Sequence, residues 1–130
     1  MTLKLPSQSS HDSAYQKVLC CARAALDKQA YEVKVFHLTA PTHFMDYLMI
    51  CSATSNRHAQ SISDFTEMQL KLAGYSLSSK EGYSEGRWIL LNFEDVIMHI
   101  FLDPIRKYYD LESLWKQAPE IPISTESLTH

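Results

Sequence analysis

The segment Arg87–Asp103 reads RWILLNFEDVIMHIFLD and contains two apolar runs separated by Glu94 and Asp95. Two intervening residues are typical of a tight β-hairpin, although such turns usually contain a glycine, which is missing here. If Phe93 faces Val96, the register is set. One face then pairs Trp88 with Phe101, Leu90 with His99 and Asn92 with Ile97. The other face pairs Ile89 with Ile100 and Leu91 with Met98. Both faces of the hairpin are therefore largely apolar.

The segments before and after the hairpin predict the remaining elements. A helix follows a cap at Ser10, Asp12 or Ser13, and strands are predicted at 31–39 and 46–53. Ser55 caps a second helix that ends at Gly74. A strand is predicted at 75–79, parallel to the strand before that helix, and a short helix follows Asp110. The helical apolar stripes consist of Val18, Leu19, Ala22, Ala25 and Leu26; Ala59, Ile62, Phe65, Met68 and Leu72; and Leu111, Leu114, Trp115 and Ala118.

This order, helix-strand-strand-helix-strand-strand-strand-helix, predicts an α/β fold with a mixed sheet of about five strands. The length of 130 residues fits one domain, which we place at 10–118 between a flexible leader at 1–9 and a flexible tail at 119–130. A chain of this size is short for covering both faces of such a sheet. An uncovered apolar face would mark a binding site for a partner.

The composition narrows the class of partner and the compartment. Lys and Arg total 12 against 15 Asp and Glu, a formal charge of −3, so the chain has no general electrostatic attraction to nucleic acid. The three cysteines lack metal-ligand spacing and suggest reduced thiols. The amino terminus resembles neither a signal peptide nor a transit peptide, and no run reaches the length of a membrane span. We expect a cytoplasmic protein without a membrane anchor.

Catalytic and metal-binding motifs give little support to an enzyme. With three glycines, neither GxxxxGK nor GxGxxG can be written. None of the six histidines stands at HxxxH spacing, although a metal site built from separate elements remains open. No nucleophile elbow is present. We therefore predict no catalytic residue, cofactor or metal.

Several polar and aromatic residues have two readings. His99 is either a sheet histidine hydrogen-bonded to Asn92 or a neighbour, or a polar group in a binding surface with Trp88. Tryptophan is by default a core residue, yet it is enriched in interface hot spots. Arg57 and His58 begin a helix, where they are either solvated or contact phosphate. A basic-aromatic cluster is formed by Arg106, Lys107, Tyr108 and Tyr109.

Two stretches, DYLMICSATSNRHAQSISD and EGYSEGRWILLNFEDVIMHIFLDPIRKYYDLESLW, resemble the ribosomal silencing factors, also called the Iojap family. The resemblance runs from about Val33 to Trp115 and rests on motifs in the family's order and spacing. It implies a nucleotidyltransferase-like fold without that superfamily's chemistry. It further implies binding to the large ribosomal subunit at its fourteenth protein, which blocks joining of the small subunit. The residues implied in partner binding are Trp88, Leu90, Asn92, His99, Phe101, Arg106, Tyr109, Arg57 and His58.

The chain departs from the family pattern at a few positions, and two alternative functions remain open. The family usually has Asp, Tyr and Gly where this chain has Asn92, Phe93 and Glu94, and Gly at Ala53. A nucleotidyltransferase-like nucleotide-binding enzyme would need paired aspartates to hold its metal ions, and the helix after Ser55 supplies Asp64 alone. A scaffold for assembly of the large subunit is the other alternative. A homodimer is also open, because members of the resembling family are often seen as dimers.

Overall fold

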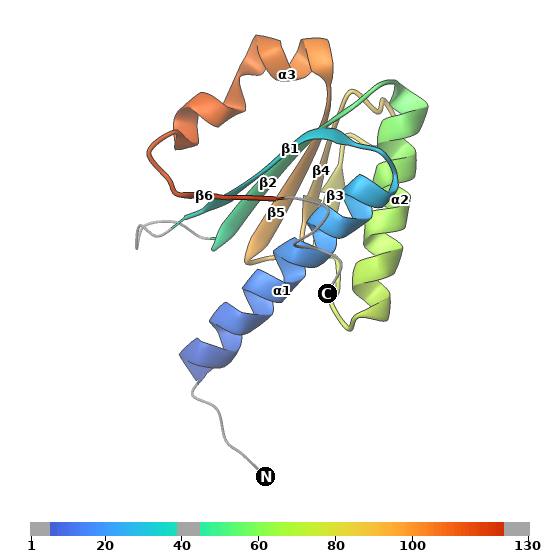
Figure 1. Cartoon of the computed structure of the whole chain (residues 1–130). Coiled ribbons are helices and arrows are strands. Elements are labelled where there is room, and N and C mark those ends of the chain that lie inside the picture. The colour runs from blue at the N-terminus through green and yellow to red at the C-terminus, as the bar shows by residue number, and fades with distance from the viewer. Residues whose placement is uncertain (1–5, 39–44, 124–130) are drawn as a thin grey trace.

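The computed structural model of the protein describes residues 6–38 and 45–123. Helices and strands are mixed along these residues, as Figure 1 shows. The elements are α1 (Pro6–Asp27), β1 (Tyr31–His37), β2 (Tyr47–Ala53), α2 (Asn56–Leu72), β3 (Ser79–Glu81), β4 (Trp88–Asn92), β5 (Val96–Leu102), α3 (Asp103–Tyr109), the 3-10 helix η1 (Leu111–Trp115) and β6 (Glu120–Ile121).

The strands form a single mixed sheet in the order β3-β4-β5-β2-β1-β6. Only the β2–β5 pairing is parallel, and the other neighbours are antiparallel. These pairings make β3 parallel to β2, so the predicted crossover through α2 is confirmed. The strand was predicted at 75–79, however, and lies at Ser79–Glu81. Tyr75 and Leu77 pack against the core instead, and pairing begins only after Ser78 donates a hydrogen bond to the Asn92 carbonyl at 2.7 Å.

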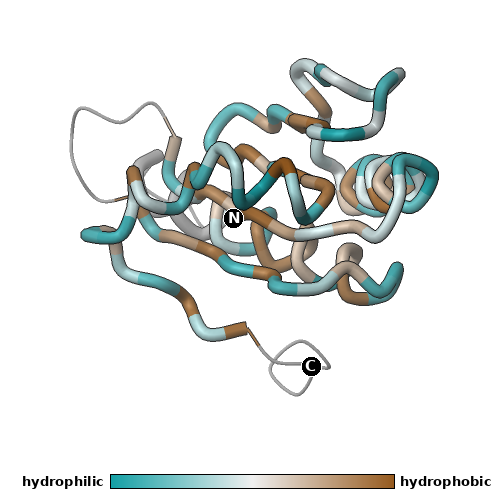
Figure 2. Tube along the Cα trace, turned by 90° about the horizontal axis from the view of Figure 1, so that it is seen from above, coloured by the Kyte–Doolittle hydropathy of each residue, from teal (hydrophilic) through white to brown (hydrophobic). Residues whose placement is uncertain are grey.

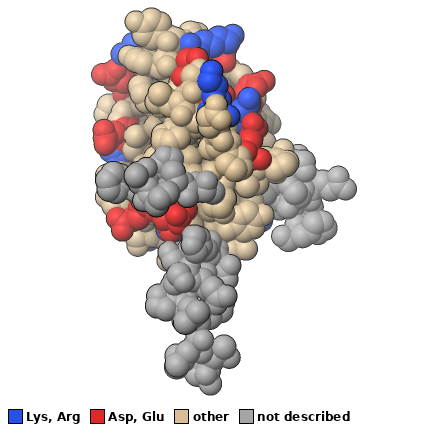
Figure 3. All heavy atoms as spheres, turned by 90° about the vertical axis from the view of Figure 1, so that its left-hand side faces the viewer, with Lys and Arg blue, Asp and Glu red and all other residues tan. Residues whose placement is uncertain are grey.

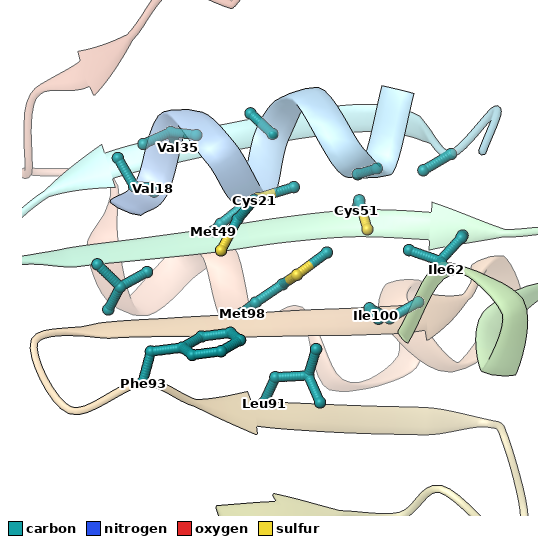
Figure 4. Close-up of a cluster of buried hydrophobic side chains, with 14 of the residues drawn as sticks. Val18, Cys21, Val35, Met49, Cys51, Ile62, Leu91, Phe93, Met98 and Ile100 are labelled. Atoms are coloured by element: carbon teal, nitrogen blue, oxygen red, sulfur yellow. The ribbon is translucent and has the colours of Figure 1, made fainter. Parts of the chain in front are cut away.

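The two faces of the sheet carry separate apolar cores. Helices α1 and α2 lie side by side over one face (Figure 1), and most of the buried side chains gather between these helices and the sheet (Figure 4). In Figure 2 the hydrophobic stretches concentrate in the interior of the molecule. A smaller core of Phe36, Leu38, Leu48, Ile50 and Phe101 lies on the other face. The main-core residues labelled in Figure 4 are Val18, Cys21, Val35, Met49, Cys51, Ile62, Leu91, Phe93, Met98 and Ile100.

The hairpin of β4 and β5 has the predicted register. Trp88 lies opposite Phe101, Leu90 opposite His99, and Asn92 opposite Ile97. The Phe93 N–H donates to the Val96 carbonyl at 2.9 Å, which confirms the starting pair. The turn contains no glycine, and Glu94 adopts the positive φ, +79°, that a glycine usually takes in such a turn.

Helix α2 has the predicted ends but a different buried face. The hydroxyl of Ser55 accepts a hydrogen bond from the His58 N–H at 3.0 Å, and Gly74 follows the helix with φ +96°. Ala59 and Ile62 are buried as predicted, whereas Met68 and Leu72 are 49% and 76% exposed. The buried residues nearer the end are Ser63, Thr66 and Leu70. Because α2 packs against α1 as well as the sheet, small side chains share its inward face with Ile62 and Leu70.

Helix α1 and the carboxyl-terminal segment correct four predicted boundaries. Helix α1 begins at Pro6, so the predicted caps Ser10, Asp12 and Ser13 lie within it. The segment 103–109, for which the sequence predicted no element, is helix α3, which has a proline in its first turn. After Asp110 the chain forms a 3-10 helix, in which Leu114 is 70% exposed. Glu120–Ile121, predicted to belong to a flexible tail, pairs with β1 as β6.

Candidate functional site

The hairpin projects one row of side chains away from α1 and α2, and we call this row the Trp88 face. Its members are Trp88, Leu90 and Asn92 from β4 and Ile97, His99 and Phe101 from β5. Phe101 is fully buried and His99 is 7% exposed, while the other four are partly exposed. The Trp88 face is therefore neither bare nor fully covered. Its apolar exposed part consists of Trp88, Leu90 and Ile97.

Segments α3 and η1 cover one end of this side of the sheet. Ile105, Leu111, Trp115 and Ala118 pack against the smaller core. Figure 3 shows one side of the molecule, where basic and acidic side chains lie interspersed in the upper part and much of the remaining visible surface is uncharged. Among the described residues, Trp88, Leu90, Asn92 and Ile97 of the Trp88 face stay partly exposed.

An aromatic cluster surrounds Trp88. Its ring stacks on Phe101, with the centroids 4.8 Å apart, and lies tilted against Tyr109, with the centroids 5.0 Å apart. Tyr109 is 55% exposed, so the cluster reaches the surface. A hollow of about 230 Å³ opens beside it, lined by Gly82, Glu85, Arg87, Trp88, Ile105 and Tyr109. Gly82 is required there, because a Cβ atom would lie 2.1 Å from the Trp88 carbonyl oxygen.

His99 forms its hydrogen bond with Trp88. The indole N–H of Trp88 donates to Nδ1 of His99 at 2.9 Å, while Asn92 accepts a hydrogen bond from the Glu94 N–H. Since Nδ1 accepts, the ring proton of a neutral His99 lies on Nε2. Burial lowers the pKa of His99 from 6.5 to about 4, so the imidazole is neutral at physiological pH. His99 therefore holds the indole in place as a neutral acceptor.

Arg106 is buried, in contrast to the exposed position that binding a partner directly would require. Its side chain is 6% exposed and forms a bidentate ion pair with Glu112, at 2.9 and 3.0 Å. Its Nη1 donates to the Glu32 carbonyl at 2.7 Å and to the Ser52 hydroxyl at 2.8 Å. Arg106 and Phe101 thus lie beneath the surface rather than on it.

Arg57 and His58 lie on a different element from the rest of the predicted set. They begin α2, which covers the opposite face of the sheet. Arg57 is exposed, while His58 donates from Nε2 to the Lys28 carbonyl at 2.7 Å and accepts at Nδ1 from the Thr54 N–H at 3.0 Å. His58 therefore ties the start of α2 to the end of α1. The structure does not bring Arg57 and His58 together with Trp88.

The positions expected of a nucleotidyltransferase site are occupied by internal hydrogen bonds. Asp64, the single aspartate of α2, accepts a hydrogen bond from the Tyr83 hydroxyl at 2.9 Å. Across the described parts of the chain, no group of three or more His, Cys, Asp or Glu residues is placed to hold a metal ion. Among the described helices, none has the length and apolar character that a membrane span requires.

Sequence reasoning missed two contacts that hold the site. Lys17 of α1 donates to the Phe93 carbonyl at 3.1 Å and to the Asp95 carboxylate at 2.6 Å, which ties the hairpin turn to the helical layer. The Arg106–Glu112 pair joins α3 to η1. The sequence did contain a signal for α3, because Asp103 followed by Pro104 is a typical helix start. The pairing of Lys17 with Asp95 spans 78 positions and has no local signature.

Comparisons with known proteins agree with this geometry. A family model described as ribosomal silencing factor during starvation matches residues 11–130. The ribosomal silencing factor of Bacillus subtilis is 34% identical over 98 residues, which cover 75% of this chain and 83% of that protein. A mouse protein named mitochondrial assembly of ribosomal large subunit protein 1 is 24% identical over 113 residues, which cover 85% of this chain and 50% of that protein.

The fold has a close match among solved structures. A crystal structure of a protein from Chromobacterium violaceum superposes with a TM-score of 0.77 at 24% identity, covering 90% of this chain and 98% of that one. This likeness confirms the mixed α/β fold. The match to the family model over nearly the whole chain and the 34% identity to a relative establish the family. The protein belongs to the family of ribosomal silencing factors.

Proposed function

We propose that this protein binds the large ribosomal subunit through its fourteenth protein and sterically blocks joining of the small subunit, which represses translation in the cytoplasm. Membership in the family supports a ribosomal partner, and the partly exposed Trp88 face is the surface that we assign to the contact. The observation that carries the proposal is the tilted contact of Trp88 with the exposed ring of Tyr109, which presents an aromatic group beside the partly exposed Leu90. Rigid aromatic anchors of this kind supply much of the energy in protein interfaces.

Electrostatics favour a basic protein as the first contact. The chain carries a net charge of −3 before its histidines are counted. A net negative charge attracts a basic surface and repels the phosphate backbone of RNA. The proposal therefore places the contact on a ribosomal protein rather than on ribosomal RNA.

Replacing Trp88 with alanine tests the proposed surface. Truncating an aromatic hot spot costs about 2 kcal/mol or more, so we expect Trp88→Ala to weaken binding to purified large subunits about 30-fold or more. Sedimentation with the subunits measures the affinity, and circular dichroism checks the fold. Met68→Ala is the matched control, because Met68 is an apolar side chain, 49% exposed, on α2. Equal binding by folded Trp88→Ala and wild type would remove Trp88 from the interface.

A role in assembly of the large subunit is a second candidate, favoured by the name of the mouse relative. An assembly scaffold would bind precursor particles, whereas a silencing factor binds mature subunits. Sedimenting the protein with each kind of particle separates the two roles. We expect mature large subunits to retain the protein.

A further inference from the structure

Arg106 connects four separate parts of the chain through one buried guanidinium. Each of its three nitrogen atoms donates a hydrogen bond: Nε and Nη2 to Glu112 of η1, and Nη1 to the Glu32 carbonyl of β1 and the Ser52 hydroxyl of β2. The arginine itself belongs to α3. Planar bidentate pairing of this kind fixes orientation as well as distance. Arg106 therefore fixes the position of α3 relative to the neighbouring strands β1 and β2.

Strand β1 is shaped to meet this arginine. Glu32 has φ +51°, a conformation that residues other than glycine rarely adopt, and the pairing of β1 with β2 shifts register between Tyr31 and Lys34. A bulge of this kind redirects backbone groups out of the ladder. Here the Glu32 carbonyl accepts a hydrogen bond from Arg106 at 2.7 Å.

Helix α3 depends on such anchors because it is short. It has seven residues, and a helix of this length has little stability of its own. Tyr109 lies one turn after Arg106 on this helix, and its ring contacts that of Trp88 in a tilted arrangement, with the centroids 5.0 Å apart. The position of Tyr109 beside Trp88 is therefore set by the anchoring of α3.

We infer that Arg106 is a positioning residue: its ion pair with Glu112 holds α3 so that Tyr109 stays against Trp88, and it acts on partner binding without contacting the partner. This inference rests on the proposed docking through the Trp88 face. The alternative, suggested by the resemblance to the family, is that Arg106 contacts the partner directly.

The two roles differ in the expected effect of Glu112→Gln. If Arg106 contacts the partner, removing the Glu112 charge frees the guanidinium and leaves binding equal or tighter. If Arg106 positions α3, the same change loosens the helix and weakens binding. Asp103→Asn is the matched control, because it also removes one carboxylate, from a pair within α3 whose Lys107 side chain is 77% exposed.

The first measurement uses the free protein. In the wild type, nuclear Overhauser contacts between the rings of Tyr109 and Trp88 report their packing directly. We expect Glu112→Gln and Arg106→Gln to lose these contacts while Asp103→Asn keeps them. Persistence of the contacts in folded Glu112→Gln would overturn the inference. Ser52→Ala removes only one of the arginine's acceptors and is used if the stronger variants fail to fold. We expect it to lose part of the contacts between Tyr109 and Trp88, and full retention of these contacts would contradict the inference.

The second measurement is binding to purified large subunits. We expect Glu112→Gln to weaken binding about tenfold, the scale of one charge-assisted hydrogen bond, and to add less than about twofold on a Tyr109→Ala background. If the double variant weakens binding by the product of the two single factors, the pair does not act through Tyr109. Unchanged binding by Glu112→Gln would show the same. If the wild type itself fails to bind, the proposed function falls, and the measurement on the free protein still decides the role of Arg106.

Discussion

His99 is a neutral acceptor buried beside Trp88. Its pKa is lowered to about 4 by burial, since a charged imidazole would lose its hydration there. The bond from the Trp88 indole to Nδ1 also requires that nitrogen to be unprotonated. The sequence allowed two interpretations of His99, and the structure contains a sheet histidine whose Nδ1 accepts a hydrogen bond. This hydrogen bond orients Trp88.

The lowered pKa of His99 predicts how stability depends on pH. Between pH about 6.5 and about 4 the unfolded chain binds a proton at His99 and the folded chain does not, so acidification favours unfolding. We expect the free energy of unfolding to fall by about 3 kcal/mol across this window from this group alone. Urea denaturation at a series of pH values measures it. Replacing His99 with glutamine, which still accepts from the indole, should flatten the profile between pH 6.5 and 4; an unchanged slope would contradict the assignment.

Glu94 occupies a backbone conformation suited to glycine. Its φ is +79°, and the strain is partly offset because its N–H donates to the Asn92 side chain at 2.8 Å. The resemblance to the family places a glycine at this position. Asn92 therefore helps to hold the turn, in place of the usual aspartate.

Relieving this strain should stabilise the protein. We expect Glu94→Gly to raise the free energy of unfolding by about 1 kcal/mol, the scale of the penalty for a side chain in this region. Thermal or urea denaturation measures the change. Glu81→Gly is the control, since Glu81 lies in β3 without a positive φ and should lose stability. A loss of stability in Glu94→Gly as well would show that the turn is unstrained.

Helix α2 shows how packing against two neighbours can mislead a periodicity argument. The apolar stripe predicted from the sequence includes Leu72, which is 76% exposed, whereas Leu70 is fully buried. Two hydroxyl groups, Ser63 and Thr66, are buried on the same helix. A helix that contacts both α1 and the sheet buries a wider arc than its apolar residues mark.

Two leucines on α2 test which of its faces is buried. We expect Leu70→Ala to cost about 2–5 kcal/mol because it leaves a cavity in the main core. Leu72→Ala, two positions later, should change the free energy of unfolding by less than about 0.5 kcal/mol. Equal losses from the two variants would mean that the helix is packed as the periodicity predicted.

The sequence was sufficient for the β4–β5 hairpin and insufficient for the segment after it. Strict alternation and one assumed pair, Phe93 with Val96, determined every opposing pair of the hairpin. Helix α3 was missed although Asp103 and Pro104 are a typical helix start. The burial of Arg106 was missed because two of its acceptors, at Glu32 and Ser52, lie 74 and 54 positions away and leave no local pattern. The same limit explains why the sequence grouped Arg57 and His58 with Trp88, although α2 covers the other face.

Among the described residues, part of one sheet face is left uncovered. Helices α1 and α2 cover one face of the six-stranded sheet, and α3 with η1 covers part of the other. The partly exposed side chains of Trp88, Leu90 and Ile97 lie on this face, where Trp88 contacts Tyr109. If ribosome binding uses this face as proposed, a second copy of the chain docked on it would compete with the ribosome, and dimerisation there should reduce activity.

Subunit joining measured with purified components tests the proposed function most directly. Large subunits are incubated with increasing amounts of the protein, small subunits are added, and the fraction of joined ribosomes is read by light scattering or gradient sedimentation. We expect joining to fall as the protein saturates the large subunits, with Trp88→Ala shifted to higher concentration and Met68→Ala unchanged. Unimpaired joining by large subunits that demonstrably carry the wild-type protein would contradict the proposal.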